Sequence, residues 1–244
     1  MKLTILGTFG PYPPAGGVCS GFLLEEGDCK ILLDCGNGVI SRLQKFTSLW
    51  DLDAIIVSHL HSDHISDLFI LRYALNIALQ KQYRTHGLDV YIPPYPEEEA
   101  QKIPFKNVYN VNYLDPNQEI EIGPFRFSFL PGVHPLYSLA MKIKCGGKVM
   151  VYSGDTEYFS ELEQFIANSH LFLCEANYQN EDMEEGLGNH LSAWQAGCLA
   201  QNNKVGRLLL THLPAFRNLH KSMAEAAEAF PNAELALEEE YYLI

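Results

Sequence analysis

The sequence feature that most restricts the fold is a cluster of metal-binding side chains between a predicted strand and a predicted helix. Residues 54–57 form a short, apolar, mostly β-branched run, which is typical of a buried strand. The cluster His59, His61, Asp63 and His64 follows at once, and residues 65–80 then carry apolar side chains near the 3.6-residue period of a helix. In an extended segment, residues two apart point to the same side, so His59 and His61 can hold one ion. Asp63 and His64, at the helix start, can reach a second ion.

Imidazole and carboxylate groups together suit zinc, with manganese and iron as alternatives. The chain has nine histidines, and three of them fall within these six positions. Unrelated surface or core histidines do not explain that density. The spacing therefore predicts a metal centre at the junction between the strand and the helix.

The length of 244 residues allows one large domain or two small ones, and we expect a single globular domain over residues 1–244. The chain is 47% hydrophobic and 19% charged, which is ordinary for a protein with a sizeable core. No stretch reaches the roughly 18 uninterrupted apolar residues of a membrane span, and the first residues do not resemble a signal peptide. We therefore expect a cytoplasmic protein without a membrane partner, and the sequence leaves a homodimer open. The six cysteines form no Cys-x-x-Cys pair, so we expect them to be reduced and mostly buried.

The formal net charge of −13 argues against a general nucleic-acid-binding surface, because such a chain repels polyanions at long range. A local phosphate site remains compatible with this charge, since bound metal ions invert the local potential.

Strands and helices alternate along most of the chain. Strands are expected at residues 2–6, 22–25, 30–33, 54–57, 89–92, 107–113, 119–122, 125–130, 139–143, 148–152, 171–174, 207–210 and, last, 234–237. Helices are expected at residues 39–46, 65–80, 96–101, 160–167, 192–202 and 221–229. The economical arrangement is a four-layer α/β/β/α sandwich, in which two packed sheets carry helices on their outer faces.

The cluster resembles the His-x-His-x-Asp-His signature of the metallo-β-lactamase superfamily, and the later motifs of that family follow in order. They are Gly132-Val133-His134-Pro135, Tyr152-Ser153-Gly154-Asp155-Thr156 and Leu209-Leu210-Thr211-His212. The resemblance implies a first metal ion on His59, His61 and His134, a second on Asp63, His64 and His212, and Asp155 as a bridge between them. It makes Asp34, in Leu33-Asp34-Cys35-Gly36, a partner of a metal-binding histidine. A site of this kind leaves positions for water, which is typical of catalytic rather than structural metals.

Within the superfamily, two further segments are similar to ribonuclease Z and its phosphodiesterase relatives. They are His190-Leu191-Ser192-Ala193-Trp194-Gln195-Ala196 and Cys174-Glu175-Ala176-Asn177-Tyr178. The resemblance implies that Glu175 orients His190, and that His190 assists the leaving oxygen. With Asp63, these residues complete the predicted catalytic set. Two metal ions can hold a bridging hydroxide and clamp an oxyanion, which suits phosphodiester hydrolysis.

The chain departs from ribonuclease Z in three places. The interval from His134 to Asp155 is too short for the arm that grips transfer RNA in the common bacterial enzyme. The segment 181–185 is strongly acidic and lies between Glu175 and His190. Asp67 stands where many relatives have glycine. The sequence therefore favours a small or short phosphodiester over a structured RNA as the substrate.

Two other hypotheses stay open. The same metal centre could hydrolyse a lactone, a thioester or an amide. The chain could instead be a non-catalytic metal-binding or scaffold protein on a degenerate fold, although the complete ligand set argues against this.

Overall fold

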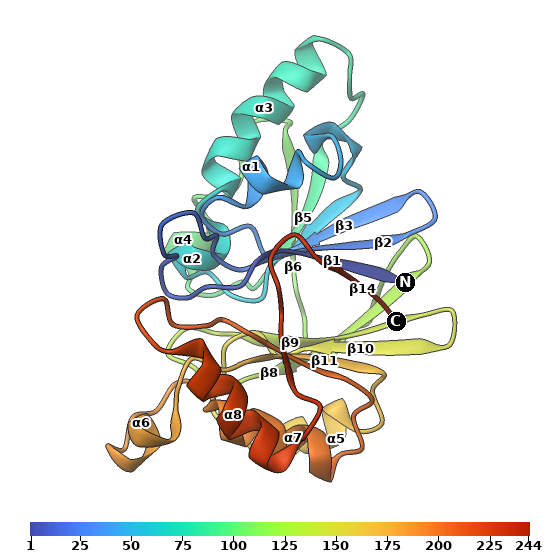
Figure 1. The fold of residues 1–244 in the computed structure, drawn as a ribbon. Helices are drawn as coiled ribbons and strands as arrows, with labels where there is room; N and C mark the ends of the chain where they lie inside the picture. Colours follow the sequence, from blue (N-terminus) through green and yellow to red (C-terminus); the bar gives the residue numbers. More distant parts are fainter.

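The computed structural model describes residues 1–244 and contains two seven-stranded sheets packed face to face (Figure 1). In spatial order, the first sheet comprises β14 (Tyr241–Leu243), β1 (Lys2–Gly7), β2 (Gly21–Glu26), β3 (Cys29–Leu33), β4 (Ala54–Ile56), β5 (Leu88–Ile92) and β6 (Tyr109–Tyr113). The second comprises β13 (Glu234–Leu235), β12 (Leu208–Thr211), β11 (Leu171–Glu175), β10 (Lys148–Tyr152), β9 (Leu139–Cys145), β8 (Phe125–Pro131) and β7 (Ile120–Ile122).

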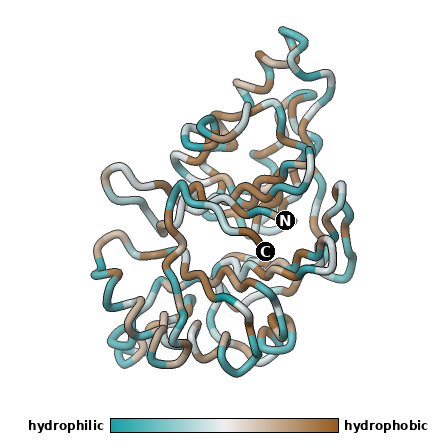
Figure 2. Tube along the Cα trace, turned by 45° about the vertical axis from the view of Figure 1, so that its right-hand side comes forward, coloured by the Kyte–Doolittle hydropathy of each residue, from teal (hydrophilic) through white to brown (hydrophobic).

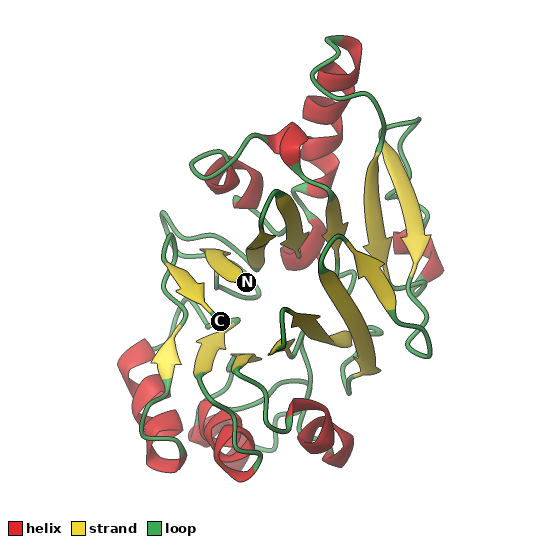
Figure 3. Ribbon diagram, turned by 90° about the vertical axis from the view of Figure 1, so that its right-hand side faces the viewer, coloured by secondary structure: helices red, strands yellow, loops and turns green.

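Helices cover the two outer faces, as Figure 3 shows. The first sheet carries α1 (Val39–Leu43), the 3₁₀ helix η1 (Leu49–Asp51), α2 (Ser62–Ile65), α3 (Leu68–Gln80) and α4 (Glu97–Ala100). The second carries α5 (Ser160–Ile166), α6 (Asn180–Glu184), α7 (Ala193–Asn202) and α8 (Leu219–Ala229). The predicted α/β/β/α sandwich is therefore confirmed. None of these helices has both the length and the apolar composition needed to cross a membrane.

Strand alternation produces the layers. Along β2, Phe22 and Leu24 join the core between the sheets, whereas Leu23 joins the core beneath α1 and α3. A separate core beneath α5, α7 and α8 includes Phe172 and Leu210 of the second sheet. Because both faces of each sheet are buried, the central strands are almost continuously apolar. Figure 2 shows this hydrophobic material concentrated along the strands in the middle of the molecule.

Strand direction places the functional loops at one edge. In the first sheet, strands β3 to β6 run parallel to one another, and β1 points in the same direction. In the second sheet, β10 to β13 run parallel to one another, and β8 points in the same direction. The segments that follow their carboxyl ends therefore meet at the same end of the sandwich. Ligand sites in open α/β sheets typically form at this end of the strands.

Three local predictions need correction. The helix expected over residues 65–80 is divided into α2 and α3, because Asp67 is turned toward the loop before α1. Its backbone N–H donates to the Cys35 carbonyl at 3.0 Å, and its carboxylate accepts from the Ile40 N–H at 2.9 Å. The acidic segment 181–185 is mostly the short helix α6 rather than an irregular loop.

The strand near residues 234–237 is also not the last one, because β14 returns to pair with β1. Its three residues are too few to give a periodic pattern, so only the partner strand identifies it.

Candidate metal centre

The loop after β4 carries the first histidines of the site. The Nε2 atom of His59 lies 2.9 Å from Nδ1 of His61, which in turn lies 3.1 Å from Nε2 of His134. His134 arrives from the turn between β8 and β9. The carboxylate of Asp155, after β10, brings its Oδ2 atom to 3.6 Å from His59 Nε2. These four residues form one group of converging ligand atoms.

A second group forms beside the first. The Nε2 atom of His212, after β12, lies 3.1 Å from Oδ2 of Asp63 and 3.2 Å from Oδ2 of Asp155. The Nε2 atom of His64 lies 3.6 Å and 3.5 Å from the same two oxygens. The Asp155 Oδ2 atom therefore belongs to both groups. The structure brings all seven predicted metal-binding residues close together, and it also places His190 in a third group with Asp155 and His212.

Two atoms in this cluster test whether a cation fits. His64 Nε2 and Asp155 Oδ1 are buried and have no hydrogen-bond partner. Buried polar atoms without a partner are costly in a protein, and each such atom calls for an explanation. The spacing between the ligand atoms is close to the roughly 3.3 Å edge of a tetrahedron with metal–nitrogen bonds of about 2.0–2.1 Å. The donor set and its unsatisfied atoms fit divalent metal ions.

In the metal-free chain, three of the predicted ligands have a pKa that favours metal binding, whereas for His64 the effect of burial is outweighed by Asp155 and Asp63, which raise its pKa well above the usual range. Burial lowers the pKa of His59 and His61, and neighbouring histidines lower both further. Burial also lowers the pKa of His134, despite the opposing effect of Asp155. The three rings are therefore neutral at neutral pH, which is the form that binds a metal ion. For Asp155, burial acts to raise the pKa, but His212 and His64 outweigh it and hold the pKa well below its usual range.

Asp34 orients His64. Its Oδ2 atom accepts hydrogen bonds from His64 Nδ1 at 2.7 Å, from the Tyr152 hydroxyl at 2.7 Å and from the Ser58 hydroxyl at 2.9 Å. Its Oδ1 atom accepts from the Ser58 backbone N–H at 2.7 Å. Because Nδ1 of His64 donates to this buried carboxylate, Nε2 is left free to face the cluster. The hydrogen bond that the sequence predicted for Asp34 is present.

His134 is oriented from the other side of the site. Its Nδ1 atom lies 2.8 Å from the carbonyl oxygen of Asn189, to which it donates. The Asn189 N–H donates to the Glu157 carboxylate at 2.7 Å. Asn189, the residue before His190, therefore fixes the ring of His134, and Glu157 in turn holds the Asn189 N–H.

His212 is enclosed by backbone and by one amide. The loop after β1 passes over its ring so closely that a Cβ atom on Gly10 would lie 1.9 Å from Nε2. The Asn177 amide donates to the carbonyl oxygens of Gly10 at 3.1 Å and of His212 at 3.0 Å. Only glycine allows this approach, so Gly10 and Asn177 fix the wall of the site at His212.

The sequence alone does not predict the roles of four residues in the site, namely Glu157, Asn189, Asn177 and Gly10. Asn189 acts through its carbonyl group and Gly10 through its lack of a side chain, so neither leaves a signal in a single sequence. Glu157, two positions after Asp155, is the one that a search near the ligands could have found.

His190 and Glu175 lie beside the two ligand groups. His190 Nδ1 is 3.0 Å and 3.2 Å from the two carboxylate oxygens of Glu175, which is fully buried. Oε1 of Glu175 also accepts from the Thr156 N–H at 2.7 Å. The His190 ring stacks on His212, with centroids 5.2 Å apart. Burial acts to lower the pKa of His190, but Glu175 outweighs this effect and raises the pKa to about 9.

The acidic helix α6 is partly neutralised by cations from the neighbouring loop and helix. Arg217 pairs with Glu181 and Asp182, and Lys221 binds Glu181 at 2.6 Å. The Asn180 N–H donates to Glu225 of α8 at 3.0 Å. The segment that carries His190 is thus tied to α8, and Arg217 is already paired.

All six cysteines are free thiols, and four of them are buried.

Comparison with known proteins agrees with this arrangement. The family described as "Beta-lactamase superfamily domain" matches residues 30–213. The probable metallo-hydrolase YhfI of Bacillus subtilis is 33% identical over 235 residues, which is 96% of either chain. The crystal structure of YhfI, a metallo-β-lactamase fold protein, matches with a TM-score of 0.92 at 32% identity and covers 99% of this chain and 98% of YhfI.

Ribonuclease Z of Bradyrhizobium diazoefficiens is 26% identical over 298 aligned residues, covering 99% of both chains. The similarity thus extends to the ribonuclease Z relatives that the second set of motifs resembles. The chain therefore belongs to the metallo-β-lactamase superfamily, as a hydrolase whose fold calls for divalent metal ions.

Proposed function

We propose that this protein is a phosphodiesterase with two divalent metal ions, built as one domain over residues 1–244. His59, His61 and His134 would hold the first ion, Asp63, His64 and His212 the second, and Asp155 both. Zinc fits this set of nitrogen and oxygen ligands, with manganese and iron as alternatives. The substrate is a small or short phosphodiester.

The observation that carries the proposal is the Glu175–His190 pair beside both ligand groups. Divalent ions in such a site supply an activated water and stabilise negative charge on oxygen. Glu175 accepts the Nδ1 proton of His190, and a ring nitrogen of His190 lies within 4.8 Å of ligand atoms of Asp155 and His212. With Nδ1 bonded to Glu175, Nε2 is the nitrogen left for the substrate. As the bond between phosphorus and the leaving oxygen breaks, the Nε2 proton of His190 passes to that oxygen. His190 then recovers a proton from water.

This proton transfer favours a phosphodiester over the lactone, thioester or amide alternatives. The alkoxide leaving group of an ordinary diester needs a proton, and general acids typically contribute about 10²–10⁴-fold to such steps. The similarity to ribonuclease Z supports the same choice. A screen of the metal-loaded protein against phosphodiesters, lactones, thioesters and β-lactams tests it, and hydrolysis of a lactone or thioester alone would reject it.

The protein should contain two metal ions per chain, because seven side chains converge and two buried polar atoms of these residues lack a hydrogen-bond partner. Elemental analysis after purification without chelator should give more than one equivalent, rising toward two on reconstitution with zinc or manganese. A content near zero that does not rise on reconstitution would rule out the metal centre.

Precursor transfer RNA should be a poor substrate. Between His134 and Asp155 the chain forms only β9 and β10, joined by the tight turn at Gly146-Gly147, so no arm is present to grip RNA. The net charge of −13 adds long-range repulsion. Gel analysis of precursor transfer RNA incubated with the pure, metal-loaded protein measures this, and efficient trimming at one site would contradict it.

A further inference from the structure

The loops around the metal centre contain almost no Lys or Arg. Ten strands point their carboxyl ends toward this edge, and the segments after them are residues 8–20, 34–38, 57–67, 93–96, 114–119, 132–138, 153–159, 176–192, 212–218 and 236–240. The chain has 17 Lys and Arg residues, yet these segments contain only Arg217. Acidic residues occur in six of the ten. Negative charge beyond the metal ions therefore finds a single basic side chain in these segments.

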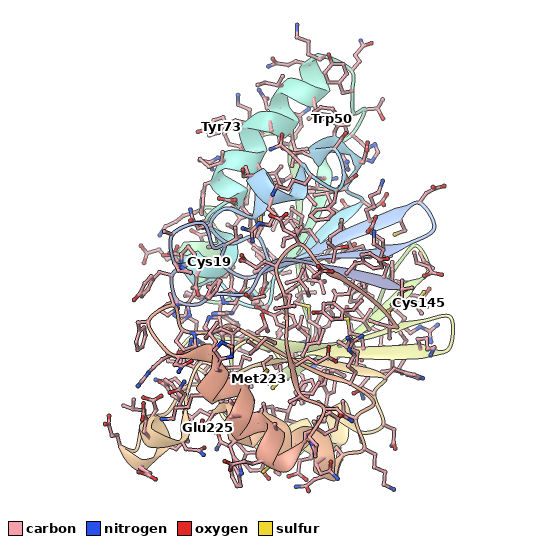
Figure 4. The ribbon with its side chains drawn as sticks, in the orientation of Figure 1. Cys19, Trp50, Tyr73, Cys145, Met223 and Glu225 are labelled. Atoms are coloured by element: carbon pink, nitrogen blue, oxygen red, sulfur yellow. The ribbon has the colours of Figure 1, made fainter.

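The cations that reach this edge are already paired. Arg217 binds Glu181 and Asp182. From the adjacent helix α1, Arg42 binds Glu238 at 2.7 Å, and both of its terminal nitrogens also donate to backbone carbonyls. Just beyond it, Lys45 binds Glu239 at 2.6 Å. No Lys or Arg is left here to hold a second phosphate. In Figure 4, Cys19 marks this end of the molecule and Cys145 the opposite one, where the hairpin turns lie.

Exposed aromatic rings lie on several of these segments. On the His212 side, Tyr12 and Phe216 are 52% and 65% exposed. Their loops run together, because the Gly10 N–H donates to the Leu213 carbonyl at 3.1 Å. On the His134 side, Tyr95 from the first sheet meets Tyr137 from the second edge-on, with centroids 6.0 Å apart.

We propose that the substrate is a phosphodiester with a single negative charge whose ester group opposite the leaving group is flat and aromatic, and that substrates with additional phosphates are discriminated against. This inference rests on the proposed phosphodiesterase function. The metal ions would balance the one charge of the diester. The aromatic group packs on Tyr12 and Phe216, since rings stack favourably on one another. A second phosphate finds no unpaired Lys or Arg side chain in these segments.

Matched substrates with a common 4-nitrophenolate leaving group test both parts. Phenyl 4-nitrophenyl phosphate should give a kcat/KM on the order of tenfold above methyl 4-nitrophenyl phosphate, after correction for their alkaline hydrolysis rates. The 4-nitrophenyl ester of thymidine 5′-phosphate should lose several-fold in kcat/KM when a 3′-phosphate is added. That loss should shrink as salt is raised, because salt screens exposed charges.

Variants identify the aromatic side chains responsible. Tyr12→Ala and Phe216→Ala should each lower the ratio of kcat/KM for the phenyl diester to kcat/KM for the methyl diester. Tyr12→Phe keeps the ring and should keep the wild-type ratio. Tyr83→Ala is the matched control, because Tyr83 is 62% exposed but lies at the far end of α3. Its ratio should equal that of the wild type.

The outcomes separate this inference from the proposed function. If the metal-loaded protein hydrolyses all of these diesters without discrimination, or prefers the substrate with the extra phosphate, the inference is wrong and the phosphodiesterase stands. If it hydrolyses none of them, both the proposed function and this inference are wrong.

Discussion

Replacing His61 with alanine is expected to remove the first metal ion and nearly all hydrolytic activity while leaving the fold intact. His61 Nδ1 lies between the Nε2 atoms of His59 and His134, at 2.9 Å and 3.1 Å, so its loss opens the centre of that ligand group. Metal ions contribute several kcal/mol of charge stabilisation, which corresponds to a loss on the order of a thousandfold or more. Elemental analysis and steady-state kinetics on the same preparation would measure both effects.

The fold should survive this change because the three hydrophobic cores do not depend on the ions, in contrast to a zinc finger. Thermal unfolding of His61→Ala should therefore match that of the chelator-treated wild type. His86→Ala serves as the control, because His86 is exposed and lies in the loop between α3 and β5. Global unfolding of His61→Ala, or a full metal content, would contradict the role given to His61.

The sequence was sufficient to predict the metal-ligand side chains that the structure brings together at the candidate site. His59, His61, Asp63 and His64 are close in sequence, and the motifs around His134, Asp155 and His212 follow strands whose carboxyl ends meet at one edge. The predicted strands also gave the two sheets, because a buried strand is recognisable from its own apolar run.

What the sequence did not reveal depends on contacts between distant segments. The carbonyl of Asn189 faces His134 only because Glu157 holds the Asn189 N–H, and neither residue has an unusual local pattern. The division between α2 and α3 depends on Cys35 and Ile40, far from the helix itself. The acidic segment appeared able to repel a polyanion by itself, whereas Arg217 and Lys221 neutralise part of it.

The pairing of the basic side chains near the metal centre restricts phosphate binding more directly than the net charge does. A chain with 17 basic residues could still have offered a basic patch beside the metal centre. The connecting segments instead supply only Arg217, which is paired with α6. The lack of unpaired Lys and Arg side chains near the metal centre therefore contributes both to the expected poor cleavage of RNA and to the expected discrimination against extra phosphates.

His190→Ala is expected to lower turnover of an alkyl phosphodiester by about 10²–10⁴-fold, the usual contribution of a general acid, while metal content stays unchanged. The loss should shrink for a nitrophenyl ester, because nitrophenolate leaves without a proton. Plotting the wild-type to variant ratio of kcat against the pKa of the leaving group measures this directly. Exposed His220 on α8 gives the matched control, and His220→Ala should show no dependence on the leaving group.

Glu175→Gln should show a milder form of the same trend, because Glu175 only orients His190 and stabilises its charge. An amide retains the shape of the carboxylate and can still accept from the Thr156 N–H, but it lacks the negative charge beside His190 Nδ1. Glu163→Gln, at an exposed carboxylate on α5 that accepts from the Tyr158 hydroxyl, controls for the substitution itself. Equal losses across all leaving groups would show that His190 does not deliver the proton. Loss of metal together with activity would instead identify His190 as a metal ligand, since its ring already lies within 4.8 Å of ligand atoms of Asp155 and His212.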